Sequence, residues 1–209
     1  LNSLLMSLFK RLLNPNYKKS EEKAKRAEKA EHSSYYPEQK LPIDEQFTYN
    51  FKNNGGKFIY CENWEEVTEA FDNIMLENDW YEQDVFCVND MLTKKFDGFN
   101  LNFTKNTDSK FFLSTCESLV SNNGSILLSS NQIKEKKLKE LPFNVIIFAT
   151  TSQIVDTISE GLRIIKNQSS GSIPSNITTI QDFETEKEKD FMSYGSSTKN
   201  LYLLLLEDL

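Results

Sequence analysis

Two short segments that are apolar almost throughout constrain the fold of this chain most strongly. Residues 144–150 (NVIIFAT) and 201–206 (LYLLLL) have the length of strands and would place apolar side chains on both faces of a sheet. Such strands are typical of parallel sheets that helices cover on both sides. Because helix patterns alternate with strand patterns along the chain, right-handed crossovers are expected. The sequence therefore predicts an α/β fold, a three-layer and mostly parallel sheet flanked by helices.

The pattern predicts one compact domain over residues 43–209, preceded by a charged extension and linker over residues 1–42. Asp44 is expected to cap a first helix that ends at Gly55-Gly56, and Asn63 with Glu66 has the spacing of a capping box. Further helices are predicted around residues 91–96 and from Ser152 to about Ile165. The predicted strands are residues 57–61, 84–88, 99–104, a segment from Phe111 into Ser114-Thr115, 125–129, 144–150, 177–180 and 201–206.

The extension differs from the rest of the chain in charge. Residues 1–32 hold eight basic and four acidic side chains, a net charge of +4, so the remainder carries −11. Six leucines between Leu1 and Leu13 recur at helical spacing, which indicates an amphipathic helix. It would contact a membrane surface or a partner, or else pack on the chain's own body. Since the apolar run precedes the positive charges, this segment does not resemble a signal peptide. Natural translation is expected to start at Met6.

Charge and two scarce residue types exclude several function classes. The chain has 24 Lys and Arg against 31 Asp and Glu, and this net charge of −7 argues against a nucleic-acid partner. Its single histidine, His32, lies in the extension, so a catalytic Ser-His or Cys-His pair in the domain is excluded. Cys61, Cys87 and Cys116 lack metal-binding spacing and are expected to be reduced core residues of a cytoplasmic protein. We therefore expect this chain to bind no metal or cofactor of its own.

Glu117 is the carboxylate that the pattern singles out. Glycine-rich phosphate-binding motifs are missing, so the polar residues after the predicted strands are the place to look for chemistry. Glu117 follows a buried strand and is the only carboxylate between Asp108 and Glu135. It could act as a nucleophile or general base, contact a ligand, or cap a helix through backbone N–H groups. The sequence leaves these roles open.

Residues 114–125 (STCESLVSNNGS) place an acid at Glu117 and a glycine at Gly124. This segment resembles the form T-x-A-D-x-x-I-A-x-T-G-T of the lactate-utilisation (LUD) domain family. Leu-Pro at 141–142 before NVIIFAT is similar to the family's L-P loop before a hydrophobic strand. The family's S-G-P-S-R-T-A-D-I would fall on residues 172–180, and its final G-x-H-G-P near residues 194–198. The resemblance extends from about Phe47 to the C-terminus.

This resemblance implies a fold like that of the ribose-5-phosphate isomerase, glucosamine-phosphate deaminase and CoA-transferase group. It also implies a part in oxidising L-lactate or a similar 2-hydroxy acid, together with oxidoreductase subunits that carry iron–sulfur clusters. This chain would be the short subunit without clusters, and a small organic acid is its implied ligand. The implied ligand-binding positions are Thr115, Glu117, Gly124, Ser125, Pro174, Ser175, Thr179 and Ser196, with Glu117 as the candidate catalytic residue.

Three positions depart from the family pattern, and they bear on catalysis. The family's Arg is Asn176, its Asp is Thr179 and its His is Ser196. Loss of the Arg removes a bidentate clamp for a carboxylate, and loss of the His removes a proton carrier that works near neutral pH. A rebuilt site or a purely complex-forming role would both account for these changes.

Three hypotheses follow. In the first, the chain is a subunit of a 2-hydroxy-acid oxidation system, and Glu117 converges with Gly124-Ser125 and Pro174-Ser175 on one pocket. In the second, it is a non-catalytic interaction module without an organised polar pocket. The third is an acyl or CoA transferase that uses Glu117 as nucleophile, which rests on analogy with the fold group.

Overall fold

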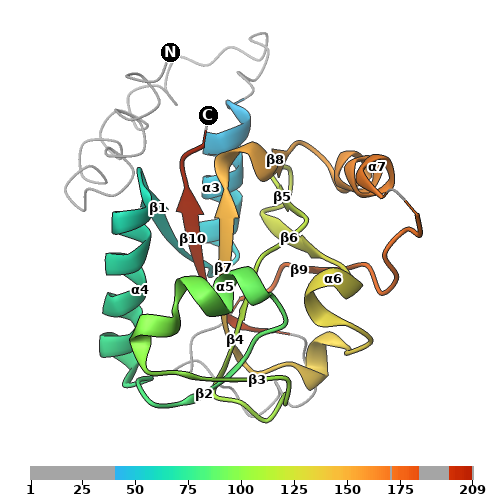
Figure 1. Ribbon diagram of the computed structural model, residues 1–209. Helices are drawn as coiled ribbons and strands as arrows, with labels where there is room; N and C mark the ends of the chain where they lie inside the picture. Colours follow the sequence, from blue (N-terminus) through green and yellow to red (C-terminus); the bar gives the residue numbers. More distant parts are fainter. Residues whose placement is uncertain (1–40, 170, 184–197, 209) are drawn as a thin grey trace, which may run out of the picture. The chain divides into compact units, whose positions relative to one another are not determined.

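A computed structural model describes residues 41–169, 171–183 and 198–208 (Figure 1). The compact unit to which they belong begins at Leu41. Almost all of the predicted extension, including its leucine pattern, Met6 and His32, lies outside the described residues, as does Ser196.

Six parallel strands form the central sheet, which confirms the predicted fold class. The strand order is β1-β10-β7-β4-β2-β3, and every neighbouring pair is parallel. The two most apolar segments, β7 and β10, lie side by side in the middle of the sheet (Figure 1) and pair along their whole length. The strands are β1 (Lys57–Cys61), β2 (Asp84–Phe86), β3 (Asn102–Thr104), β4 (Phe111–Ser114), β7 (Asn144–Thr150) and β10 (Asn200–Leu206).

One face of this sheet is covered by helix α4 (Trp64–Asn78) and the short helix α5 (Asp90–Lys95). Asn63 begins α4 as predicted, since its side chain accepts a hydrogen bond from the Glu66 N–H at 2.9 Å. The apolar side of α4 then packs on the strands. The fully buried members of this core include Val67, Phe71, Met75, Leu92, Phe96, Val85, Phe111, Leu113, Ile146 and Leu204.

The opposite face is also buried, and part of its cover is a second sheet. Phe112, Val145 and Leu203 point away from α4 and are fully buried. Helix α3 (Ile43–Asn53) packs against β1 and against the second sheet, whose order is β8-β5-β6-β9. Helix α7 (Ile158–Gln168) packs on that second sheet, with Ile165 against Val120 and Leu127. The second sheet comprises β5 (Ser118–Val120), β6 (Ser125–Leu128), β8 (Ile154–Val155) and β9 (Thr178–Ile180).

The second sheet overturns one predicted helix and adds a strand that we did not predict. The segment from Ser152 to Ile165 is a 3-10 turn (Thr151–Gln153), strand β8 and only then the start of α7. Strand β5 was missed because three residues are too few to show a period. Strands β5 and β8 are held by pairing with distant parts of the chain, and a local sequence pattern cannot predict such pairing.

Other differences concern element ends. Helix α3 begins at Ile43 with Pro42 in the cap position, so Asp44 lies in the first turn and does not cap it. Pro suits this end because it lacks an N–H that the helix would leave unpaired. The strands predicted at 84–88, 99–104, 125–129 and 177–180 are shorter than expected, since they occupy Asp84–Phe86, Asn102–Thr104, Ser125–Leu128 and Thr178–Ile180.

The three cysteines are free and buried, as predicted. Burial raises the pKa of Cys61 to about 12 and that of Cys87 to about 11, with a hydrogen bond to the Asn89 backbone opposing the rise at Cys87. Among the helices that the structure describes, none has both the length and the apolar character that a membrane crossing requires.

Candidate functional site

Glu117 lies on the connection between the two sheets. The central strand β4 ends at Ser114, and three residues later Glu117 precedes strand β5, where its N–H donates to the Leu127 carbonyl at 2.9 Å. Leu127 is the residue that Ser118 faces in the antiparallel pairing of β5 and β6, so this bond lies at the end of that pairing. The main chain of Glu117 is therefore fixed by the sheet, which leaves its half-buried side chain to take part in other contacts.

One oxygen of the Glu117 carboxylate holds the start of helix α6 (Ser130–Ile133). Its Oε1 accepts hydrogen bonds from Ser129 Oγ at 2.5 Å and from Asn131 Nδ2 at 2.9 Å. Ser129 is the N-cap of α6 and forms a capping box with Gln132, whose Oε1 accepts from the Ser129 N–H. Glu117 thus supports a helix cap through side chains, whereas the sequence suggested contact with backbone N–H groups. Its Oε2 has no hydrogen-bond partner within the described part of the chain.

A cleft of about 520 Å³ opens beside this carboxylate. It lies where the start of β5, helix α6, the end of α7 and the connection from α7 to β9 come together, on the right of Figure 1. Among the described residues, its lining combines one carboxylate with amides, hydroxyls and two apolar side chains, and it includes no lysine or arginine. The lining residues are Glu117, Asn131, Ile165, Gln168, Ser169, Gly171, Ser172 and Pro174.

The connection that forms the outer wall of the cleft is tied to α6 by hydrogen bonds. The Ser130 N–H donates to the Ser175 carbonyl at 2.8 Å, and Ser175 Oγ donates to Glu135 at 3.3 Å. Asn176 Nδ2 donates to the carbonyls of Lys134 and Lys136 at 2.7 and 2.8 Å. Asn176 also has a positive φ of 52°, which Asn tolerates better than most residues. Its amide therefore shapes the connection and lies outside the lining of the cleft.

Gly124 and Ser125 lie at the opposite end of the β5–β6 hairpin. Strand β6 separates Ser125 from Ser129 by about 13 Å at the usual rise per residue. Gly124 has a φ of 67°, and a Cβ there would come within 2.4 Å of the Phe51 backbone nitrogen. Ser125 is buried and donates to Asn123 Oδ1 at 2.8 Å. This turn packs tightly on α3, so the predicted convergence on one pocket fails for these two residues.

The remaining predicted ligand-binding residues are distributed as follows. Pro174 lines the cleft together with Glu117, and Ser175 borders it through the hydrogen bonds described above. Thr115 is half-buried directly after β4, and Thr179 lies in β9 opposite Leu127, and neither lines the cleft. Sequence reasoning missed Asn131 and Ser129, although the Ser-x-x-Gln spacing from Ser129 to Gln132 is a capping-box signal that could have found them.

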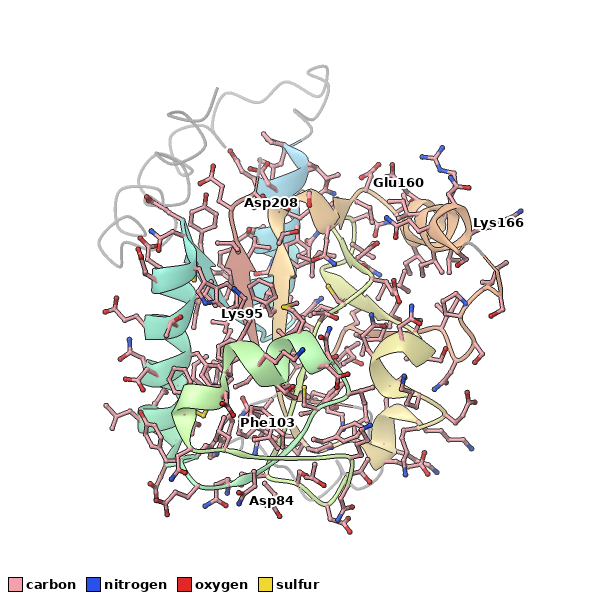
Figure 2. All side chains as sticks on the ribbon, in the orientation of Figure 1. Asp84, Lys95, Phe103, Glu160, Lys166 and Asp208 are labelled. Atoms are coloured by element: carbon pink, nitrogen blue, oxygen red, sulfur yellow. The ribbon has the colours of Figure 1, made fainter. Side chains whose placement is uncertain are left out.

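A second polar cluster lies at the carboxyl ends of β7 and β10. Asp208 accepts hydrogen bonds from Thr151 Oγ1 at 2.9 Å, from the Ser152 N–H at 2.9 Å and from Ser152 Oγ at 2.7 Å. Burial alone would raise the pKa of Asp208, but these hydrogen bonds lower it. Figure 2 shows Asp208 just beyond the end of β10 and apart from α7, and Asp208 does not line the cleft. With every one of these contacts made inside the chain, the cluster serves to hold the turn after β7.

Another hollow of similar size, about 530 Å³, lies at the amino ends of the central strands. Asp84 and Asn144 are the first residues of β2 and β7, and both line it. None of the predicted site residues that the structure describes lines this hollow, whereas Glu117 and Pro174 both line the cleft beside Glu117, which is therefore the candidate site. No group of three or more His, Cys, Asp or Glu side chains within the described ranges is arranged to hold a metal ion.

Comparison with known families bears on the same part of the molecule. A sequence model of the LUD domain matches residues 100–205, which is just over half of the chain. The chain belongs to the LUD-domain family. The matched region contains both Glu117 and Pro174, and it includes the whole second sheet, the central strands β4 and β7, and all of β10 except Leu206.

A solved structure supports the fold of this LUD domain. A crystal structure of a DUF162 family protein from Deinococcus radiodurans superimposes with a TM-score of 0.54 at 14% sequence identity. The superposition covers 81% of this chain and 100% of that chain, so it extends beyond the residues that the family model matches. At this identity the likeness concerns the fold alone. The comparison with curated proteins gives no match.

Proposed function

We propose that this LUD-domain chain is a non-catalytic, complex-forming subunit of a system that oxidises L-lactate or a similar 2-hydroxy acid. In this proposal the electrons pass to an iron–sulfur cluster on a partner subunit, and the hydroxy acid reacts on the partner. Membership of the LUD-domain family supports a role in this kind of system.

The non-catalytic assignment rests on the hydrogen bonds that the Asn176 side chain makes. By resemblance this position holds an Arg that would clamp the carboxylate of the substrate, and here its side chain binds the carbonyls of Lys134 and Lys136. The residue at this position therefore stabilises the backbone of the connection and offers no positive charge to an acid.

The electrostatics of the cleft support the same conclusion. A 2-hydroxy acid is an anion at neutral pH, and the cleft presents the Glu117 carboxylate without a lysine or arginine among the described residues that line it. The Glu117 carboxylate would repel the carboxylate of a bound acid, most strongly where water is partly excluded. One oxygen of Glu117 also accepts hydrogen bonds from Ser129 and Asn131 at the cap of α6, which is a structural contact.

The proposal is tested by gentle anaerobic affinity purification of the full chain from its native cells. We expect an iron–sulfur chromophore to co-purify and to bleach when L-lactate is added. The Glu117→Gln variant is expected to retain both the partner and the bleaching, because the carboxylate takes no part in the chemistry. Glu69→Gln, an exposed position on α4, is the matched control for the loss of one negative charge.

Two results would contradict the proposal in different ways. A colourless protein without partners would remove the redox role altogether. A complex that forms normally but no longer bleaches with Glu117→Gln, while Glu69→Gln still bleaches, would make Glu117 part of the chemistry and refute the non-catalytic assignment.

A further inference from the structure

We infer that the cleft beside Glu117 is a binding site for an organic cation, that is, for an ammonium or guanidinium group carried on an apolar stem. This inference does not depend on the redox role proposed above. It follows from the charge, the free hydrogen-bonding capacity and the shape of the cleft.

The first observation is the free oxygen of the carboxylate. Oε1 of Glu117 is occupied by Ser129 and Asn131, and these two donors fix the orientation of the group. Oε2 has no donor among the described residues, and the side chain is half-buried at a cleft that it lines. An oriented carboxylate with one open oxygen matches an N–H donor that carries a positive charge, because charge-assisted hydrogen bonds are the strongest of their kind.

A second, independent observation is the helix end at the same cleft. Helix α7 is 11 residues long and ends at Gln168, and Gln168 and the cap residue Ser169 line the cleft. The carboxyl end of a helix carries a partial negative charge of about half an electron, which attracts cations. The helix end and the carboxylate therefore favour the same sign of charge in the ligand.

The positive side chains nearby do not supply this cation. Lys166 is the basic residue in the last turn of α7, and Figure 2 shows it projecting outward from that helix, away from the body of the domain. Within the part of the chain that the structure describes, no residue of the lining carries a positive charge. The acceptor oxygen is therefore open to a ligand from outside.

The shape of the cleft selects an amphiphilic cation. Ile165 and Pro174 provide apolar wall, while Asn131, Gln168 and Ser172 can hydrogen-bond to further polar groups. A volume of about 520 Å³ accommodates a chain of several methylene groups together with its charged end. A free alkyl amine and a lysine or arginine side chain of another protein share this chemistry.

The test uses a matched series of probes and isothermal titration calorimetry on the full chain at low salt. Pentylamine, pentan-1-ol and pentanoate have the same stem and differ in the charge of the head group, and L-lactate is a second anion. We expect pentylamine to bind at least about tenfold more tightly than pentan-1-ol, and its affinity to fall as salt is added. No binding of pentanoate or lactate is expected.

Two variants assign the binding to this cleft. Glu117→Gln keeps an acceptor for Ser129 and Asn131 but removes the charge, so pentylamine should bind no better than pentan-1-ol. Ser172→Lys places an ammonium group in the cleft from an exposed position and should weaken pentylamine binding by about tenfold, through competition for the same oxygen. Because Ser172 is exposed, this variant tests the inference even where Glu117→Gln impairs folding. Glu69→Gln is the control and should bind as the wild type does.

The two sources of the cation are separated by peptides. Acetyl-Gly-Lys-Gly-amide and acetyl-Gly-Arg-Gly-amide present the same groups on a protein backbone, and tighter binding than pentylamine would identify a side chain of a protein partner as the source. Tighter binding of pentylamine would identify a free amine. The inference is overturned where pentylamine binds no more tightly than pentan-1-ol or not at all, where the anions bind as well as the amine, or where wild type, Glu117→Gln and Ser172→Lys bind it equally.

Discussion

Replacing Lys199 with methionine should change how the stability of this domain depends on pH. Lys199 precedes β10, is only 3% exposed and donates from Nζ to the Leu141 carbonyl at 2.9 Å. No carboxylate of the described residues pairs with it. Burial lowers the pKa of Lys199 from 10.5 to about 8, because the charged form loses its hydration.

The sign of the effect follows from proton binding. Between about pH 8 and pH 10.5 the unfolded chain keeps the proton of Lys199 while the folded chain loses it, so stability rises with pH over this window. Below about pH 8 both states are protonated, and the buried charge lowers stability by a constant amount. One pKa unit corresponds to about 1.4 kcal/mol, so the upper limit of this penalty is roughly 3 kcal/mol. Water reaching the ammonium group reduces it, and we expect 1 to 3 kcal/mol, as order-of-magnitude figures.

The assay is urea unfolding of the wild type and of Lys199→Met at a series of pH values from about 7 to about 10.5. Methionine keeps the length of the stem and removes the charge, at the cost of one hydrogen bond to the Leu141 carbonyl. That cost is the same at every pH. The stability of the variant relative to the wild type should therefore fall by about 1 to 3 kcal/mol as the pH rises through this window.

The comparison must be made as a difference between the two proteins. The buried thiols have raised pKa values and make both proteins less stable at alkaline pH, by equal amounts. A difference that stays constant within about 0.5 kcal/mol across the series would refute the reasoning, because it would mean that burial does not penalise this charge.

Three further predictions concern the described contacts. Gly124→Ala should lower the free energy of unfolding by at least about 2 kcal/mol in urea titration, because the turn has a positive φ and lies against α3, whereas Gly98→Ala, in open space, should have a much smaller effect. Asn176→Ala should cost about 1 to 3 kcal/mol in the same assay, through the loss of two hydrogen bonds and of a residue suited to positive φ, and an unchanged stability would show that the connection does not depend on it. The three cysteines should react with Ellman's reagent only after denaturant is added, since all are buried and their thiolates are disfavoured, and rapid labelling of the native protein would contradict this.

The sequence predicted the central sheet well because two of its inner strands have a recognisable, continuously apolar pattern. NVIIFAT and LYLLLL coincide with β7 and nearly with β10, since a segment that is buried on both faces must be apolar throughout. The cap at Asn63 was also predictable, because it depends on two residues that are close in sequence. The second sheet could not be predicted in this way. Its strands β5 and β8 have only three and two residues, and they are held by the pairing of β5 with both β8 and β6.

The candidate site shows the same limit. Glu117 could be singled out as an isolated carboxylate after a strand, and the family resemblance added Pro174. The donors Ser129 and Asn131 come from the end of β6 and from α6, and only the hairpin brings them to Glu117. Gly124 follows the family spacing but contacts α3. It lies in the turn of the β5–β6 hairpin, whereas Glu117 and the cleft lie at the open end of the same hairpin.

The position of β10 has a consequence for how the chain folds. This last strand of the described chain lies between β1 and β7, and within the sheet β1 pairs with β10 alone, so that Lys57 is opposite Tyr202. During synthesis β1 must wait without a partner until almost all of the domain has left the ribosome. Closing so large a loop is slow, and an unpaired apolar strand in the meantime invites association with other chains. The domain should therefore depend on chaperones for its yield, more than a protein whose neighbouring strands are also neighbours in sequence.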